Sequence, residues 1–277
     1  MKQRIIVGLD GTEFSLSAIH WACRRAQTFG GILIGIAILD KPGIRKTGVG
    51  AGVGSSYYAQ RSIDSKMEHA STRTKEFMDQ FERICAESKV PCEIYLKIGN
   101  PFEVFKEECK IADLTILGLR TFFKFETTQK PDDNLIRKLM REPVCPIIGV
   151  PKKVQPHRNV IIMYSGKAAS TRAMRAWAHI SPNIPDTYKV KLLTVTDSVE
   201  DGEYLLNRAE IYLKAYGIHP EKIWHTGNPE NAMYETAKEF SPSLVVVGEE
   251  MDKPSYFFGR RTTKLMEDGT LPMFVYY

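Results

Sequence analysis

Two stretches of the sequence carry residue types that could hold a phosphate group. Residues 47–56, TGVGAGVGSS, contain four glycines after an apolar run, and bare backbone N–H groups in such turns can approach an anion closely. Residues 257–263, FFGRRTT, place one glycine, two arginines and two threonines at the start of an expected helix. Because cations are disfavoured at a helix N-terminus, these arginines favour an anionic partner. Solvated arginines at an ordinary helix start are the alternative.

Other groups of reactive side chains do not complete a catalytic or metal-binding motif. The segment YSGKAAS lacks the first glycine and the Gly-Lys-Ser/Thr order of a P-loop. Asp10 and Ser15 have only His20 nearby, on the same expected helix, so they form no catalytic set. Glu249 and Glu250 follow an apolar strand and could hold a metal beside phosphates, but exposed loop carboxylates are the common alternative. We therefore predict neither catalytic residues nor metal ligands.

The five cysteines do not suggest a disulfide framework or a zinc site. Their number is odd, and no two of them form a C-x-x-C pair. His219 and His225 are close in sequence but have no acidic or sulfur ligand pattern beside them. We therefore expect reduced, mostly buried thiols.

The composition is that of a globular protein. Apolar residues make up 43% of the 277 residues and charged residues 26%. No apolar run approaches the roughly 18–20 residues that span a bilayer, and the N-terminus does not resemble a signal peptide. The net charge of +5 is a mild excess without a long Lys/Arg block. We therefore expect a cytoplasmic protein with neither a membrane nor a nucleic acid as its partner.

The sequence contains one internal repeat. Each copy opens on an apolar strand, a glycine turn and a helix, and each contains a helix that starts with GNP and a recurring closing segment. The matched segments are RIIVGLDGTEFSLSA (4–18) with NVIIMYSGKAASTRA (159–173), KIGNPFEVFKEECKIADLTILG (97–118) with HTGNPENAMYETAKEFSPSLVVVG (225–248), and KLMREPVCPIIGV (138–150) with KLMEDGTLPMFVY (264–276).

The repeat predicts two domains and a short linker. The first domain is expected over 1–152 and contains an insertion over 40–60 that has no counterpart in the second copy. The linker, 153–158, lies in the polar and basic stretch PKKVQPHR, which two prolines interrupt. The second domain is expected over 159–277.

Strands and helices alternate within each copy, and this order predicts the fold class. Strands such as LTILGL and LVVVG are apolar throughout, which is typical of strands covered on both faces in a parallel sheet. We predict two doubly wound α/β domains, each an open five-stranded parallel sheet flanked by helices, with ligands at the carboxyl ends of the strands. In the first copy we expect strands at 4–9, 32–39, 92–98, 113–118 and 145–150, with helices near 14–28, 61–88, 101–111 and 132–141.

The opening IIVGLDGTEFS, the closing ADLTILG…KLM…CPIIGVP and the repeated order of elements resemble the tandem universal stress proteins. The resemblance covers nearly the whole chain. It implies that the last strands of the two domains join them across a pseudo-twofold axis as an internal dimer. Homodimerisation of the whole chain is left open.

The resemblance also implies an ATP site at the strand ends of each domain. Adenine and ribose would lie against the first turn and the end of the second strand, and the phosphates on a loop patterned G-x2-G-x9-G-[ST]. Asp10, Gly11 and Gly118 match this pattern in the first copy, but both later glycines and the Ser/Thr are missing. Asp132 and Asp133 at the last helix start would repel a triphosphate. We therefore interpret the first site as degenerate.

The second copy departs from the pattern differently. Ser165 stands in place of the usual aspartate, Met251 in place of the second glycine, and the loop is two residues shorter. Arg260 replaces the Ser/Thr. The binding residues that the resemblance implies here are Ser165, Gly166, Val195, Gly248, Gly259, Arg260, Arg261 and Thr262.

The resemblance implies a stress-response regulator or sensor that binds ATP or a related adenine nucleotide weakly or in one domain, with Mg²⁺ accompanying the nucleotide. Protein partners are expected, and slow ATP hydrolysis is the most that enzyme activity would amount to. The alternative is a scaffold with degenerate sites. The glycine-rich part of the insertion, 43–56, follows the second strand rather than the fourth and has no Lys-Ser/Thr. We interpret it as a flexible insertion, and a lid over the first copy is left open.

Overall fold

The computed structural model describes residues 3–40, 56–120, 135–141, 144–154, 158–248 and 271–276. These residues form two compact units, Met1–Val144 and Cys145–Tyr277. The glycine-rich segment lies outside the described residues, except that Ser56 is the first residue of a helix.

The first unit alternates strands and helices as the sequence predicts. Its elements are β1 (Arg4–Leu9), α1 (Glu13–Phe29), β2 (Ile32–Leu39), α3 (Ser56–Glu87), β3 (Cys92–Ile98), α4 (Pro101–Glu108), the 3₁₀ helix η1 (Cys109–Ile111), β4 (Leu114–Gly118) and α5 (Leu135–Arg141). The bounds predicted for the first three strands are those observed. The helix predicted over 101–111 divides into α4 and η1 at Cys109.

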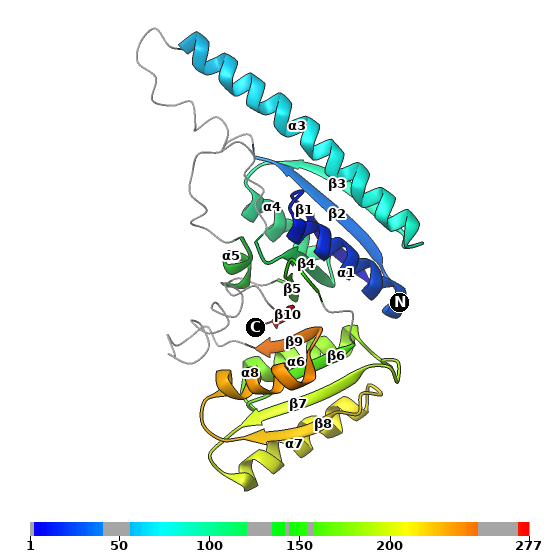
Figure 1. Ribbon diagram of the computed structural model, residues 1–277, viewed down its shortest axis with the longest axis vertical. Helices are drawn as coiled ribbons and strands as arrows, with labels where there is room; N and C mark the ends of the chain where they lie inside the picture. Colours follow the sequence, from blue (N-terminus) through cyan, green and yellow to red (C-terminus); the bar gives the residue numbers. More distant parts are fainter. Residues whose placement is uncertain are drawn as a thin grey trace. The chain divides into compact units, whose positions relative to one another are not determined.

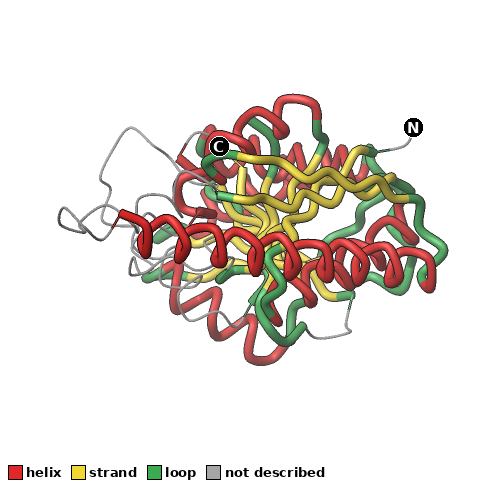
Figure 2. Tube along the Cα trace, turned by 90° about the horizontal axis from the view of Figure 1, so that it is seen from above, coloured by secondary structure: helices red, strands yellow, loops and turns green. Residues whose placement is uncertain are grey.

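All the described strand pairs of the first unit are parallel, in the order β3-β2-β1-β4. Helices pack on both faces of the strands (Figure 1, Figure 2). Every residue of β4 is buried, as are Leu33 and Ile36 of β2. The order reverses at β1, because β2 follows it on one side and β4 lies on the other. This is the topological switch point at which open α/β sheets bind ligands.

Helix α3 has two halves with different surroundings. Its second half packs on the sheet through buried residues such as Ala70, Phe81 and Cys85. None of the described side chains between Arg61 and His69 is buried, and Figure 1 shows this first half extending past the end of β2. The buried residues of the second half, and not the polar first half, therefore fix α3 on the sheet.

The second unit begins with the strand predicted to close the first copy. Its elements are β5 (Ile147–Val150), β6 (Asn159–Met163), α6 (Ala168–Ile180), β7 (Lys189–Val195), α7 (Val199–Lys214), β8 (Glu221–His225), α8 (Pro229–Phe240), β9 (Leu244–Gly248) and β10 (Met273–Tyr276). Their order in the sheet is β5-β10-β9-β6-β7-β8.

Four strands of the second unit repeat the topology of the first. The parallel order β8-β7-β6-β9 corresponds to β3-β2-β1-β4, and the switch point lies at β6. Strand β10 is parallel to β9, whereas β5 is antiparallel to β10, with Ile148 opposite Phe274. Both residues are fully buried, so this pairing contributes to the core of the second unit.

The helix starts predicted from the two GNP segments are confirmed. The Oδ1 atom of Asn100 accepts a hydrogen bond from the Phe102 N–H at 2.9 Å, and Oδ1 of Asn228 accepts one from the Glu230 N–H at 2.8 Å. A proline follows each cap at the first helical position, where its missing N–H removes no helical hydrogen bond. Across the described residues, none of the helices is long and apolar enough to cross a membrane.

Candidate functional site

The candidate site of each unit lies at the carboxyl end of the switch-point strand. In the first unit this is the turn Asp10–Thr12 between β1 and α1, and in the second it is Ser165–Lys167 between β6 and α6. The strands before both turns are buried, whereas Gly11 and Gly166 are exposed. Each turn therefore presents backbone and polar side chains to a ligand at the sheet edge.

Asp10 and Thr12 build the turn of the first unit. Gly11 has a φ of +69°, a left-handed conformation that favours glycine. The Asp10 Oδ1 atom accepts hydrogen bonds from the Thr12 N–H at 3.0 Å and from the Thr12 hydroxyl at 2.8 Å. Thr12 in turn caps α1 by accepting from the Ser15 N–H at 3.2 Å. Asp10 is 1% exposed, so it stabilises the turn from its buried side.

A serine braces each turn from the first turn of the following helix. Ser15 Oγ donates to the Gly8 carbonyl at 2.9 Å and accepts from the Asp10 N–H at 3.3 Å. Ser170 Oγ donates to the Lys167 carbonyl at 3.0 Å and accepts from the Ser165 N–H at 3.2 Å. The matching serines of the sequence repeat are therefore structural braces of the two turns.

An apolar side chain from the next helix lies against one side of the glycine of each turn. A Cβ atom built on Gly11 would lie 1.8 Å from the Phe77 ring of α3. One built on Gly166, whose φ is +73°, would lie 2.4 Å from Cδ2 of Leu205 on α7. The two turns are thus built alike, but the side chain against the glycine is larger in the first unit, Phe77, than in the second, Leu205.

Gly248, at the end of β9, has a packing reason to be glycine. A Cβ there would lie 2.1 Å from the carbonyl oxygen of Ala169 and 2.5 Å from the Ser170 nitrogen, both in the first turn of α6. This close approach brings the end of β9 against the candidate turn of the second unit. Gly118 occupies the matching place at the end of β4 and is buried.

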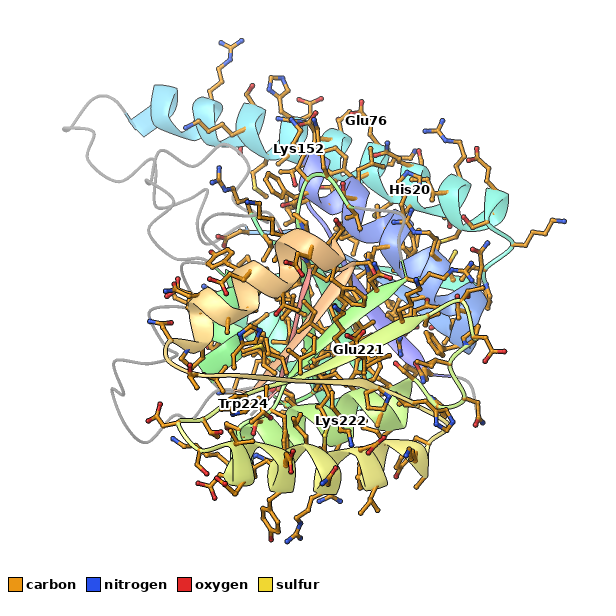
Figure 3. All side chains as sticks on the ribbon, turned by 60° about the horizontal axis from the view of Figure 1, so that its bottom comes forward. His20, Glu76, Lys152, Glu221, Lys222 and Trp224 are labelled. Atoms are coloured by element: carbon orange, nitrogen blue, oxygen red, sulfur yellow. The ribbon has the colours of Figure 1, made fainter. Side chains whose placement is uncertain are left out.

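The end of β7 forms another side of the second site. Val195 is half-buried and pairs with His225 of β8. The next residue, Thr196, accepts a hydrogen bond through Oγ1 from the Trp224 indole N–H at 2.9 Å. Trp224 lies on β8 (Figure 3), and its ring contacts Gly202 of α7, because a Cβ on Gly202 would lie 2.2 Å from the indole. The tryptophan thereby fixes the strand end beside Val195.

The charges at the two sites differ. In the first unit, Asp10 after β1 and Asp40 after β2 are buried carboxyl groups at the carboxyl edge. The matching residues of the second unit are Ser165, which is uncharged, and Asp197, which is exposed, and Lys167 is exposed in the same turn as Ser165. An anion at the switch-point turn would meet the Asp10 carboxyl group in the first unit, whereas the second unit has no carboxyl group in that place.

Several predicted residues lie outside the described part of the chain. They are Gly259, Arg260, Arg261 and Thr262 of the phosphate loop, together with Asp132, Asp133, Glu249, Glu250 and Met251. The structure therefore brings together Ser165, Gly166, Val195 and Gly248 in the second unit, and Asp10, Gly11 and Gly118 in the first.

Two other predictions concern catalysis and metal binding. His20 is exposed on α1, beyond Ser15 along the helix (Figure 3), and none of the described hydrogen bonds joins it to Asp10 or Ser15. Within the described ranges, no group of three or more His, Cys, Asp or Glu residues is arranged to hold a metal ion.

Sequence reasoning missed the residues that support the site through space. Phe77, Leu205 and Trp224 are far from the turns in sequence, and nothing in the motifs indicates them. Thr12 and Asp40 had a weak signal, because a threonine directly before a helix and an aspartate directly after an apolar strand are common at caps and strand ends.

Comparison with solved structures identifies the fold. A universal stress protein from Archaeoglobus fulgidus DSM 4304 matches with 12% sequence identity, covering 99% of this chain and 95% of that chain, at a TM-score of 0.68. A functionally unknown protein from Pseudomonas aeruginosa PAO1 matches with 10% identity, covering 99% and 92%, at a TM-score of 0.55. A universal stress protein solved in complex with cAMP matches with 18% identity over 44% of this chain and 99% of that chain, at a TM-score of 0.36.

The sequence itself matches no protein-family model and no curated protein. The likeness to the archaeal protein extends along the whole chain, so the chain has the α/β fold of a universal stress protein, with sheet strands flanked by helices.

Proposed function

We propose that this chain is a tandem pair of universal-stress-type domains, each contributing five strands around a pseudo-twofold axis. We further propose that it binds an adenine nucleotide in its second domain and acts in the cytoplasm as a regulator or sensor. ATP, accompanied by Mg²⁺, is the proposed ligand. The domains would be 1–152 and 159–277, with 153–158 as the linker.

The observation that carries the proposal is the duplicated turn at the switch point with different charges in its two copies. Both turns combine an exposed glycine of positive φ with a serine brace. The second turn has Ser165 and Lys167 where the first has a buried aspartate and a threonine. A hydroxyl and an ammonium group suit phosphate oxygens, whereas buried carboxylates repel them.

The phosphate-binding part of the proposal rests on the sequence. Gly259 would allow close approach to a helix start, and Arg260, Arg261 and Thr262 would donate to phosphate oxygens there. Gly166 and Val195 would lie against the adenine and ribose. We propose slow hydrolysis at most, since no general base is evident among the predicted residues.

A scaffold without a nucleotide is the second candidate, and a specific observation favours it. The polar atoms of both turns already have partners within the protein, such as Thr12 for Asp10 and Ser170 for Ser165. In addition, Tyr204 and Ile211 of α7 are 57% and 72% exposed. Large apolar side chains that are exposed on a helix surface, as these two are, can contact a protein partner.

Calorimetric titration of the full chain with Mg-ATP separates the two candidates. We expect heat of binding at millimolar nucleotide for the unaltered protein, and a loss of roughly tenfold or more in affinity for the double variant Arg260→Ala, Arg261→Ala, because two charge-assisted contacts are removed. A charge-matched control is Lys152→Ala, Lys153→Ala, which should bind as the unaltered protein does. No heat from any of the proteins would support the scaffold, and equal affinity of the two double variants would contradict the proposed role of Arg260 and Arg261.

A further inference from the structure

Three of the five cysteines gather in the first unit, although they are far apart in the sequence. Cys23 lies in α1, Cys85 in the last turn of α3, and Cys92 is the first residue of β3. The Cys85 thiol is in hydrogen-bonding contact with both Cys23 and Cys92. The cluster lies near the C-terminal ends of α1 and α3 and at the start of β3, at the edge of the first unit's strands opposite the turn Asp10–Thr12.

The surrounding backbone holds the three cysteine-bearing segments together. The Gln27 side-chain amide of α1 donates to the Ser88 carbonyl after α3 at 2.8 Å. The Val90 N–H donates to the Cys85 carbonyl at 2.9 Å, which brings the chain from α3 into β3. Leu33 of β2 pairs with Cys92. These contacts keep the thiols adjacent without a covalent bond.

The three thiols differ in access to solvent. Cys23 and Cys85 are 2% and 0% exposed, whereas Cys92 is half-buried at the start of an edge strand. Cys85, which contacts both other thiols, lies between the buried member of the cluster and the one that solvent reaches.

The environment also makes the thiols chemically different. Hydrogen bonds donated by Cys85 and by Ser88, together with the charge of Arg24, stabilise the Cys23 thiolate and lower its pKa to about 7 despite the opposing effect of burial. The pKa of Cys85 is raised, first by its hydrogen bond to Cys23 and then by burial. Burial is the largest cause of the raised pKa of Cys92. These contacts therefore favour the thiolate form at Cys23 over Cys85 and Cys92.

We propose that Cys23, Cys85 and Cys92 form a thiol–disulfide site that a hydroperoxide oxidises and that an external thiol reduces through Cys92. The Cys23 thiolate attacks one peroxide oxygen, the O–O bond breaks with two electrons from sulfur, and the other oxygen leaves as hydroxide or water. The resulting sulfenic acid condenses with the Cys85 thiol. A Cys23–Cys85 disulfide forms, and water leaves with the Cys85 proton.

Reduction proceeds by one disulfide exchange within the cluster and two exchanges with an external thiol. The Cys92 thiolate attacks Cys85 Sγ, which forms a Cys85–Cys92 disulfide and returns the Cys23 thiolate. A first thiol from solvent attacks the accessible Cys92 sulfur, which releases the Cys85 thiol and leaves a mixed disulfide on Cys92. A second thiol then attacks the mixed disulfide, which releases Cys92 and forms the disulfide of the external thiol. Each exchange conserves one disulfide bond, so the net reductant is the external thiol. The site works without a nucleotide, and its failure would leave the proposed function unaffected.

The test is peptide mapping by mass spectrometry of the full chain after brief treatment with hydrogen peroxide. We expect one disulfide, between Cys85 and either Cys23 or Cys92, and its disappearance after treatment with glutathione. Cys109 and Cys145 are buried thiols outside the cluster, and they serve as internal controls that should remain free.

Two variants assign the roles. Cys85→Ser should form no disulfide within the cluster and should leave a sulfenic acid on Cys23 that dimedone traps. Cys92→Ser should still form the Cys23–Cys85 disulfide, but glutathione should reduce it roughly tenfold more slowly, because the accessible exchange partner is lost.

Three results would overturn the proposal, and the first two come from the unaltered protein, so they do not depend on whether a variant folds. One is that all three thiols stay free, or that Cys23 proceeds to a sulfinic acid without a disulfide. Another is that the disulfide formed includes Cys109 or Cys145. The third is a Cys92→Ser variant that glutathione reduces at the unaltered rate.

Discussion

Gly248 offers a direct test of how the second candidate site is packed. A Cβ atom at this position would lie 2.1 Å from the Ala169 carbonyl oxygen and 2.5 Å from the Ser170 nitrogen. Both atoms belong to the backbone, so no rotation of a side chain relieves the clash. In Gly248→Ala, the end of β9 and the first turn of α6 must therefore separate by about 1 Å, the difference from an ordinary van der Waals contact.

The size of the effect follows from comparison with overpacked cores. Substitutions that overpack a core lower the free energy of unfolding by about 1–3 kcal/mol. Because no side chain can move to relieve the clash, we expect a loss of about 3 kcal/mol for Gly248→Ala. Gly227→Ala is the matched control in the same unit. Its φ is +81°, and a Cβ there meets nothing within 4 Å, so it should cost only the backbone strain of about 1 kcal/mol.

Urea unfolding of both variants, monitored by tryptophan fluorescence, measures the two free energies of unfolding. We expect Gly248→Ala to lose about 2 kcal/mol more than Gly227→Ala. Equal losses in the two variants would refute the reasoning. They would mean that packing does not require the glycine, and its motif position would then favour contact with a ligand.

Three further predictions concern the supports of the two sites and the thiol cluster. Ser15→Ala should lower the free energy of unfolding by about 1–3 kcal/mol, because two buried backbone groups lose their partner; a change below about 0.5 kcal/mol in urea unfolding would contradict the brace. Trp224→Phe should lose about 1 kcal/mol with the indole–Thr196 hydrogen bond, whereas an unchanged denaturation midpoint would show that the bond contributes nothing. The lowered pKa of Cys23 should make the reduced protein more stable as pH rises from about 7 toward 9, since the unfolded thiol still binds its proton in that window. Above pH 9 the raised pKa values of Cys85 and Cys92 should make the free energy of unfolding fall as pH rises. An equal gain in stability between pH 7 and 9 in the Cys23→Ala variant would contradict the assignment to Cys23.

Much of the fold could be predicted because local signals mark it. Apolar runs next to glycine turns indicated the bounds of β1 and β2, and Pro91 and Gly99 flank β3. The Asn-Pro pairs indicated the starts of α4 and α8. The strands that are apolar throughout indicated a sheet covered on both faces, and β4 is buried along its whole length. The sequence repeat indicated the order of elements that both units share.

The supports of the site could not be predicted, because they depend on contacts between distant segments. Phe77 lies against Gly11 because α3 packs on β1 and β2, which are far from it in the sequence. Cys23 and Cys85 are buried, as expected, but no spacing rule shows that they meet. The packing of Gly248 against Ala169 likewise follows from the close approach of β9 and α6, which the sequence alone does not specify.

The measurement that tests the central claim most directly is native mass spectrometry of the full chain with millimolar ATP and Mg²⁺. The proposed function predicts a complex whose added mass is that of one adenine nucleotide, and its disappearance in the Arg260→Ala, Arg261→Ala variant. A spectrum that contains only the unbound chain at every nucleotide concentration would contradict it.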